Sequence, residues 1–361
     1  MSKTHSLGDK DLRLSNILIE WYATFRRDLP WRATKNPYHI WLSEVILQQT
    51  RVDQGRSYYD RFVLRFPDIH SLAQADEEEV LKLWQGLGYY SRARNLHATA
   101  KDIEQRFNGV FPRRYKDILS LKGVGEYTAA AISSFAYDEA HAVVDGNVYR
   151  VLSRIYGIED AIDSSGGQKV FRAIAAWVLN DENPAQHNQA IMEFGALQCV
   201  PVSPDCGSCP ASEMCLSYAR GEVSKFPIKQ GKVKTRDRYF YYFHIRQGDY
   251  TYISKREKKD IWQNMYEFPL IELAEPIDEG QILSVDFIRL VVDGLLPQKV
   301  EIVHKTKHVL SHQIIYATFI RVGLEEGGAL PRYTKIEASC LGDYPVSRLM
   351  DKYVIFANKL E

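Results

Sequence analysis

Apolar residues recur at helical spacing through roughly the first 224 residues and at strand spacing further on. One apolar stripe runs from Leu14 to Phe25 and another from Val80 to Leu87, and in each the members lie three or four positions apart. Proline and glycine often interrupt these stripes. The pattern therefore predicts an all-helical first domain, built from many short helices with tight turns between them.

The period changes after Phe226-Pro227. Four β-branched and aromatic runs of strand length follow, at residues 239–245, 250–254, 300–303 and 314–320. Between the two regions, residues 225–238 carry six lysines and arginines against one acid and have no apolar periodicity, so we interpret them as a basic linker. We predict an α+β multidomain fold: an all-α domain over residues 1–224, the linker over 225–238, and a smaller α/β domain over 239–361.

Composition limits the function classes. The 361 residues are 45% hydrophobic, enough for two cores, and contain no apolar run of membrane-spanning length. The first thirteen residues lack the apolar stretch of a signal peptide. We therefore expect a cytoplasmic protein that does not enter a membrane. The net charge of zero means that any contact with nucleic acid must come from local basic patches.

Four of the five cysteines lie within seventeen residues. Cys199, Cys206, Cys209 and Cys215 have the spacing C-x6-C-x2-C-x5-C. In a reducing compartment such crowding favours a metal or cluster site over disulfides. Four thiolates suit a tetrahedral zinc ion as well as an iron–sulfur cluster, so the chemistry of the ligands leaves both open.

Two carboxylates stand in unusual surroundings. Gly123 and Gly125 precede an alanine-rich helical run, and such a turn presents backbone N–H groups that suit a DNA phosphate. Twenty residues on, Asp145 interrupts the apolar stretch 143–148, where it is a helix N-cap, a catalytic group aimed into a cleft, or both. Glu44 lies among apolar residues at 41–47, so burial should raise its pKa unless the helix turns it toward solvent.

These motifs together resemble the endonuclease III superfamily of helix-hairpin-helix DNA glycosylases. The cysteine spacing is similar to the 4Fe–4S loop of that superfamily, and the glycine hairpin followed by Val-Asp-Gly-Asn-Val is similar to its signature. The segments 30–32 and 41–50 resemble the adenine-acting branch, and the resemblance extends from about Leu14 to Tyr353. It implies a 4Fe–4S cluster held by the four cysteines, a Nudix-like second domain without a Nudix box, and a monomer that binds duplex DNA containing an adenine mispair.

The resemblance also assigns roles to individual residues. Asp145 would stabilise the positive charge that develops on the sugar, and Glu44 would protonate adenine, which leaves poorly unless a ring nitrogen is protonated. The other expected site residues fall into four groups. Tyr127 and Asn147 would lie beside Asp145, and the adenine pocket would be lined by Trp31, Arg32 and Gln189. The residues expected to contact DNA are Gln49, Thr50, Leu87, Tyr89, Gly123 and Gly125, and those expected to recognise an oxidised guanine opposite the adenine are Leu310, Ser311 and His312.

Two positions depart from patterns found among the relatives. Tyr127 occupies the slot where lyase-competent members carry a lysine, so we expect base excision without β-elimination. Leu310 replaces an aromatic residue in the lesion-reading loop. The expected reaction is removal of adenine opposite 8-oxoguanine or guanine, leaving an abasic site. The alternatives are a bifunctional glycosylase-lyase for oxidised pyrimidines, a mismatch sensor without catalysis, and a zinc protein.

Overall fold

The residues that the computed structural model describes are 10–231 and 235–359, so residues 232–234 of the predicted linker lie outside the described residues. The chain forms two compact units. Unit 1 consists of residues 1–74 and 98–231, and unit 2 consists of residues 75–97 and 232–361.

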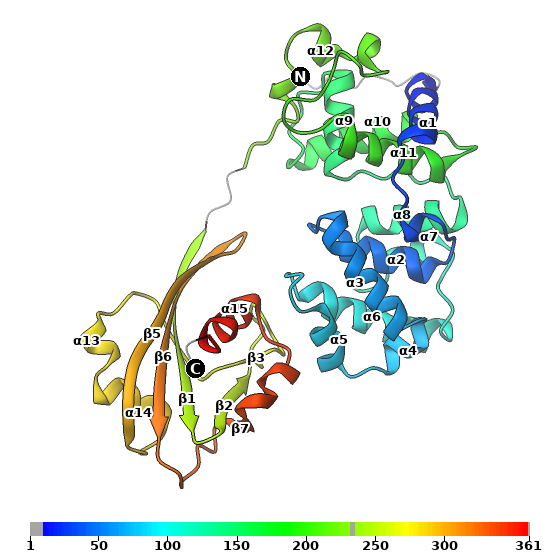
Figure 1. The fold of residues 1–361 in the computed structure, drawn as a ribbon. Coiled ribbons are helices and arrows are strands. Elements are labelled where there is room, and N and C mark those ends of the chain that lie inside the picture. The colour runs from blue at the N-terminus through cyan, green and yellow to red at the C-terminus, as the bar shows by residue number, and fades with distance from the viewer. Residues whose placement is uncertain (1–9, 232–234, 360–361) are drawn as a thin grey trace. The chain divides into compact units, whose positions relative to one another are not determined.

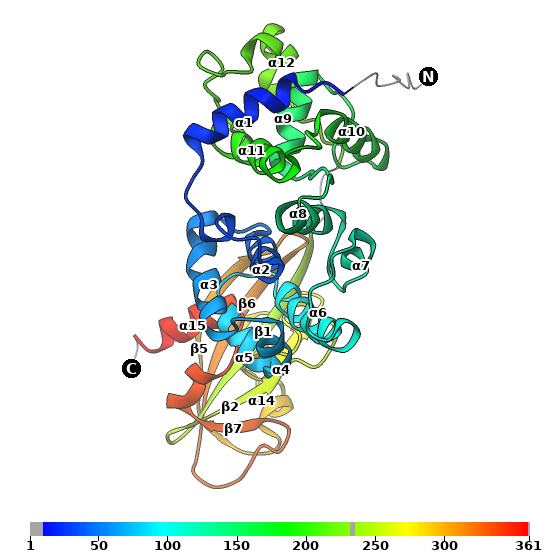
Figure 2. The ribbon, with the colours of Figure 1, turned by 90° about the vertical axis from the view of Figure 1, so that its right-hand side faces the viewer.

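Unit 1 is helical, as the sequence predicts, and its helices form two groups. In Figures 1 and 2, α2, α3, α4, α7 and α8 lie together with the end of α6, while α1, α9, α10, α11 and α12 form the second group. The helices are α1 (Arg13–Phe25), α2 (Pro37–Leu47), α3 (Val52–Arg65), α4 (Ile69–Gln74), α6 (Ser91–Phe107, which begins in unit 2), α7 (Tyr115–Leu119), α8 (Glu126–Tyr137), α9 (Gly146–Tyr156), α10 (Ser165–Val178), α11 (Pro184–Leu197) and α12 (Leu216–Ala219), with 3-10 turns at Pro30–Arg32, Ser212–Met214 and Val223–Lys225.

Capping residues mark where a helix of the site begins, and close contacts between helices fix their positions. Asn36 caps α2 by accepting a hydrogen bond from the backbone N–H of Tyr38, and Pro37 occupies the first turn, where its missing N–H costs nothing. Helix α8 contacts both α2 and α11, and so joins the two groups. Helices α9 and α11 approach closely at Gly195, where an added Cβ would lie 2.6 Å from the Cβ of Asn147. A glycine is required at that crossing.

Unit 2 contains a mixed sheet with helices against it. The strand order is β3-β2-β1-β6-β5, with β4 paired to β1 and β7 paired to β2. Strands β1 and β6 are parallel, and the other pairs are antiparallel. The elements are α5 (Glu77–Trp84), β1 (Arg236–Gln247), β2 (Tyr250–Lys255), β3 (Tyr266–Glu267), β4 (Leu270–Leu273), α13 (Glu279–Ile282), α14 (Val285–Val292), β5 (Pro297–Val309), β6 (Gln313–Leu324), β7 (Thr334–Glu337), a 3-10 turn (Ala338–Asp343) and α15 (Arg348–Ala357).

Hydrophobic side chains cover both faces of this sheet. On one face, Phe243 and Ile245 of β1 pack in a buried cluster with Ile288 and other residues of α14. On the other face, Tyr353 of α15 stacks on Phe319 of β6 with ring centroids 3.8 Å apart. Figure 1 shows α13 and α14 on one side of the sheet and α15 on the other. The four strands that the sequence predicts correspond to β1, β2, β5 and β6.

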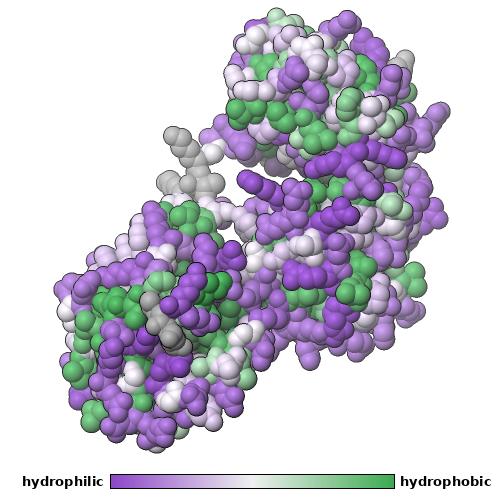
Figure 3. All heavy atoms as spheres, in the orientation of Figure 1, coloured by the Kyte–Doolittle hydropathy of each residue, from purple (hydrophilic) through white to green (hydrophobic). Residues whose placement is uncertain are grey.

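Hydrophilic side chains cover most of the face shown in Figure 3, and the hydrophobic ones form small separate groups there. Within residues 10–231 and 235–359, none of the helices combines the length and the apolar character needed to cross a bilayer.

Candidate active site

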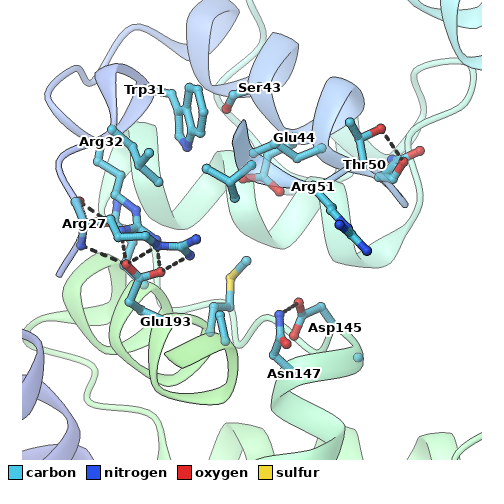
Figure 4. Close-up of a pocket in the computed structure, with 18 of the residues that line it drawn as sticks. Arg27, Trp31, Arg32, Ser43, Glu44, Thr50, Arg51, Asp145, Asn147 and Glu193 are labelled. Atoms are coloured by element: carbon cyan, nitrogen blue, oxygen red, sulfur yellow. Dashed lines mark hydrogen bonds and ion pairs between the residues drawn. The ribbon is translucent and has the colours of Figure 1, made fainter. Parts of the chain in front are cut away.

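A cavity of about 780 Å³ opens between the two helix groups of unit 1. Its volume lies in the range of about 300–1,000 Å³ that is usual for small-molecule pockets. The sequence-predicted residues that line it are Trp31, Arg32, Glu44, Gln49, Thr50, Tyr127, Asp145, Asn147 and Gln189. They come from segments up to 158 positions apart, 31 to 189, so tertiary folding assembles the site. Figure 4 shows the cavity with several of these side chains around it.

Glu44 is a buried acid on α2. The phenol of Tyr127, on α8, donates a hydrogen bond of 2.6 Å to Oε2 of Glu44. Burial is the main cause that raises the pKa of Glu44 to about 7; the hydrogen bond from Tyr127 lowers this pKa, and the negative charge of Asp145 raises it. A carboxyl with a pKa near 7 retains a proton in a large fraction of molecules at neutral pH, as a general acid must. The structure thus confirms the expected burial of Glu44.

Asp145 is held by one backbone group and one side-chain group of α9. As the N-cap of this helix it accepts a hydrogen bond at Oδ1 from the backbone N–H of Val148, 2.8 Å away. At Oδ2 it accepts a second bond from the side-chain amide of Asn147, at 2.9 Å. Burial raises the pKa of Asp145, and these hydrogen bonds oppose that rise. The N-cap interpretation is confirmed, and the same carboxylate lines the cavity.

Arg150 fixes the orientation of the amide beside Asp145. Its guanidinium donates to Oδ1 of Asn147 at 2.9 Å and to the backbone carbonyl of Gly195 at 2.6 Å. Because the amide oxygen of Asn147 is occupied in this way, its N–H₂ group is directed to Asp145. The glycine at the α9–α11 crossing thus supports the geometry of the carboxylate.

Glu193, which was not among the residues expected from the sequence, anchors the wall opposite Glu44. Arg32 donates to its two carboxylate oxygens at 2.8 and 2.7 Å, and Arg27 donates to them at 2.9 and 2.5 Å. Burial by itself would raise the pKa of Glu193, but the hydrogen bonds from Arg32 and Arg27 lower it to about 2. Figure 4 shows this three-residue cluster at one side of the cavity.

The remaining pocket residues have defined contacts. Gln189 accepts a hydrogen bond of 2.7 Å from the phenol of Tyr22, and Trp31 is buried with its ring edge-on to Tyr59.

A signal for Glu193 was available in the sequence, because it follows Gln189 by four positions and therefore shares its helix face. Arg27 gave no comparable signal, since its partner lies 166 positions away.

The expected DNA-contacting residues fall in turns and loops. Gly123 has φ +75° in the turn before α8, and Gly125 is the N-cap of that helix; neither lines the cavity. Gln49 has φ +55° and Tyr89 has φ +47°, a left-handed conformation that is uncommon outside glycine and often found at functional sites. Gln49 and Thr50 belong to unit 1, whereas Leu87 and Tyr89 belong to unit 2.

In unit 2, the expected lesion-reading residues form the loop between β5 and β6. The backbone N–H of Leu310 donates to the carbonyl of Gln313 at 2.8 Å, which closes the hairpin around Ser311 and His312. Ser311 and His312 are exposed. The hydroxyl of Ser311 lies 2.5 Å from that of Tyr89, within the same unit. A residue expected to contact the DNA, Tyr89, is therefore adjacent to one expected to recognise the lesion, Ser311.

The four expected cluster ligands line one small cavity in unit 1, and Arg154 lies beside them. A guanidinium nitrogen of Arg154 is 3.5 Å from Sγ of Cys199. Burial raises the pKa of Cys209 to about 11. Four thiols facing one cavity, with a cation beside them, match the donor chemistry of a thiolate-bound cluster. Among the described residues, however, no three cysteine, histidine or acidic side chains are close enough together to hold one metal ion.

Two family profiles match the chain. Residues 42–178 match the HhH-GPD superfamily of base excision DNA repair proteins, and residues 241–355 match the NUDIX domain. These matches confirm the expected fold class, a helical glycosylase domain followed by a Nudix-like domain.

Curated relatives from a bacterium, a plant and a mammal each match more than half of this chain. The adenine DNA glycosylase of Buchnera aphidicola subsp. Baizongia pistaciae is 36% identical over 301 residues, which are 83% of this chain and 83% of that protein. The adenine DNA glycosylase of Arabidopsis thaliana is 34% identical over 73% of this chain and 48% of its own length, and that of Homo sapiens is 40% identical over 57% and 39%.

Solved structures share the helical fold. A thermostable thymine-DNA glycosylase aligns with a TM-score of 0.54 and 29% identity, covering 57% of this chain and 95% of its own. A non-covalent endonuclease III–DNA complex aligns with a TM-score of 0.50 and 22% identity, covering 58% and 94%, and at that identity it supports the fold alone.

Proposed function

This chain belongs to the adenine DNA glycosylase family of base-excision repair enzymes, and we propose that it hydrolyses the N-glycosidic bond of adenine paired with 8-oxoguanine or guanine in duplex DNA, leaving an abasic site. The observation that carries the proposal is one cavity lined by both Glu44, whose pKa is raised to about 7, and Asp145. The two carboxyls differ in surroundings, which suits one for donating a proton and the other for stabilising a cation.

The first step is the departure of the base. The adenine must leave the helical stack to enter the cavity, at a cost of a few kcal/mol. The protonated Glu44 then donates its proton to a ring nitrogen of adenine as the bond between C1′ and the base breaks, and the bonding electrons leave with the base. The phenol of Tyr127 holds the carboxyl in place through its 2.6 Å hydrogen bond.

The second step is addition of water to the sugar. Loss of the base leaves an oxocarbenium-like sugar, and the carboxylate of Asp145, held by Asn147 and Val148, faces the same cavity and stabilises that charge. Water adds to C1′ and releases one proton. The products are free adenine and an abasic site, so no further reactant is needed.

The test is base release under single-turnover conditions from duplexes that differ only in the base opposite adenine. We expect release opposite 8-oxoguanine and guanine, and a Glu44→Gln rate lower by about 10²–10⁴-fold because general acid catalysis is lost. Glu20→Gln is the matched control, since Glu20 is an exposed glutamate on α1 that does not line the cavity. Retention of the wild-type rate by Glu44→Gln would remove this residue from the mechanism.

The same assay separates the rival activities. Tyr127 has no amine and cannot form a Schiff base with the sugar, so we expect abasic sites without strand cleavage and no covalent trapping by borohydride. Strong trapping on duplexes with an oxidised pyrimidine would favour the bifunctional alternative. Tight mismatch binding with no adenine released at large enzyme excess would favour a sensor.

We assign recognition of the opposite base to the loop containing Ser311 and His312. The support is its exposure at the tip of the β5–β6 hairpin and the contact between Ser311 and Tyr89. Ser311 and His312 can hydrogen-bond an oxidised purine, whereas Leu310 can offer only apolar contact. In a Ser311→Ala enzyme, the ratio of the adenine-release rates opposite 8-oxoguanine and opposite guanine should fall by a larger factor than the release rate opposite guanine.

For the four cysteines we propose a 4Fe–4S cluster with a structural role, as is common in this family. Iron and acid-labile sulfide should be found in anaerobically purified protein, with visible absorption that Cys206→Ser weakens. Zinc in stoichiometric amount without iron would instead show that the four cysteines form a zinc site. The domain boundaries at 224 and 239, the monomeric state and the cytoplasmic location stay predictions.

A further inference from the structure

Of the residues that the structure describes, four arginines line the cavity, and three of them are already engaged. Arg27 and Arg32 share the carboxylate of Glu193. Arg150 donates to the backbone carbonyls of Gly195 and Cys199 and to the side chain of Asn147. Each of these guanidiniums therefore has a structural partner in the folded chain.

The fourth, Arg51, differs. Its side chain is exposed at the cavity lining, and the guanidinium makes no hydrogen bond or ion pair with any other residue in the described parts of the chain. It is the N-cap residue of α3, but its side chain makes no capping hydrogen bond. Figure 4 shows it extending from the α2–α3 connection, beside Glu44 and above Asp145 in this view, with no dashed line reaching it. The cations that act on the pKa values of those two carboxyls are Arg32 and Arg150.

A free guanidinium at such a place lacks an anion, and the substrate supplies one there. An extruded nucleotide that places its base near Glu44 and its C1′ near Asp145 must carry the two flanking phosphates at the entrance of the cavity, because the DNA strand enters and leaves there. A guanidinium binds a phosphate through two parallel N–H groups. The chain has a net charge of zero, so its attraction for DNA depends on such local cations.

We propose that Arg51 binds a phosphate flanking the extruded adenosine and so holds the nucleotide with its C1′ between the two carboxyls. This inference rests on the proposed function and adds to it a binding residue for the DNA backbone. Arg51 does not touch the base or the bond that breaks, so it contributes to binding and positioning the nucleotide rather than to proton transfer.

The test compares Arg51→Gln with Arg56→Gln, its matched control. Arg56 lies on α3 five positions later, is exposed, and does not line the cavity. Binding is measured at several salt concentrations on a duplex whose target adenosine carries a 2′-fluorine, which resists cleavage because fluorine disfavours positive charge on the sugar. For Arg51→Gln we expect the slope of log K against log salt to fall in magnitude by about one, and Kd to rise roughly tenfold. Arg51→Lys should keep the slope and lose part of the affinity.

Neutral methylphosphonates placed in turn at the phosphates 5′ and 3′ of the target adenosine identify the contact. One of the two should weaken the wild-type protein while leaving Arg51→Gln unchanged, because the contact is already absent. The inference is overturned if Arg51→Gln keeps the wild-type salt slope, or if both replacements weaken the two proteins by equal factors. A failure of the proposed function looks different, since wild type would then release no adenine from any mispair.

Discussion

Replacing Tyr127 by phenylalanine removes a hydrogen bond that favours the ionised form of Glu44. The phenol donates to Oε2 of that carboxyl at 2.6 Å, and this bond lowers the pKa of Glu44, which burial otherwise raises. Tyr127→Phe should therefore raise that pKa above its value of about 7. A hydrogen bond to a charged group is worth about 1.5–3 kcal/mol, and one pKa unit equals about 1.4 kcal/mol, so the expected rise is about one to two units.

The sign of the effect on catalysis follows from the role of the acid. Glu44 donates its proton, so adenine release should fall as pH rises through about 7 in the wild-type enzyme. In Tyr127→Phe this alkaline limb should move to higher pH by about one to two units. The acidic limb belongs to Asp145, whose pKa burial raises, and the substitution should move it less.

The assay is single-turnover adenine release measured from pH 5 to 9.5, with enzyme in excess and saturating. Tyr59→Phe is a suitable control, because Tyr59 contacts Trp31 in the same helix group but does not line the cavity. A lower plateau in Tyr127→Phe with a shifted limb is compatible with the reasoning. An unmoved alkaline limb, or one moved to lower pH, refutes the assignment of Glu44 as the acid under the control of Tyr127.

Three further predictions concern the structure around the site. Glu193→Gln should lower the free energy of unfolding by about 3 kcal/mol at pH 7, because the pKa of Glu193 falls from 4.5 to about 2 on folding. In denaturant titrations, the stability difference between wild type and variant should be complete above pH 4.5 and should vanish as pH falls toward 2. Gly195→Ala should slow adenine release by more than tenfold, since its Cβ would displace Asn147, whereas Gly166→Ala, which has open space, should not. Glu44→Gln should bind the 2′-fluoro duplex about as tightly as wild type; a large loss of affinity would indicate a folding defect instead.

Much of the fold was readable from short-range patterns. Helical spacing predicted α1, β-branched and aromatic runs predicted β1, β2, β5 and β6, and an acid followed by glycine indicated the N-cap of α9. These signals work because a helix or strand sets which positions face the same side. The short strands β3, β4 and β7 were not predicted, since they contain two to four residues each and form along the longer strands β1 and β2.

The chemistry of the cavity depended on contacts between distant positions. The sequence indicated that Glu44 is buried, but the partner that tunes its pKa lies 83 positions away. Likewise, nothing near Arg27 or Arg32 in the sequence indicated that Glu193, 161 or more positions on, would engage both and leave Arg51 as a free cation.

The sequence by itself determined which residue types were available, where helical spacing and the four longer β-branched and aromatic runs would form helices and strands, and to which family the motifs point. Only the tertiary structure decided which of those groups share one cavity, which charges neutralise each other, and which carboxyl keeps its proton. The physical reason is that secondary structure follows from neighbours three or four positions apart, whereas desolvation and ion pairing depend on which helix faces meet.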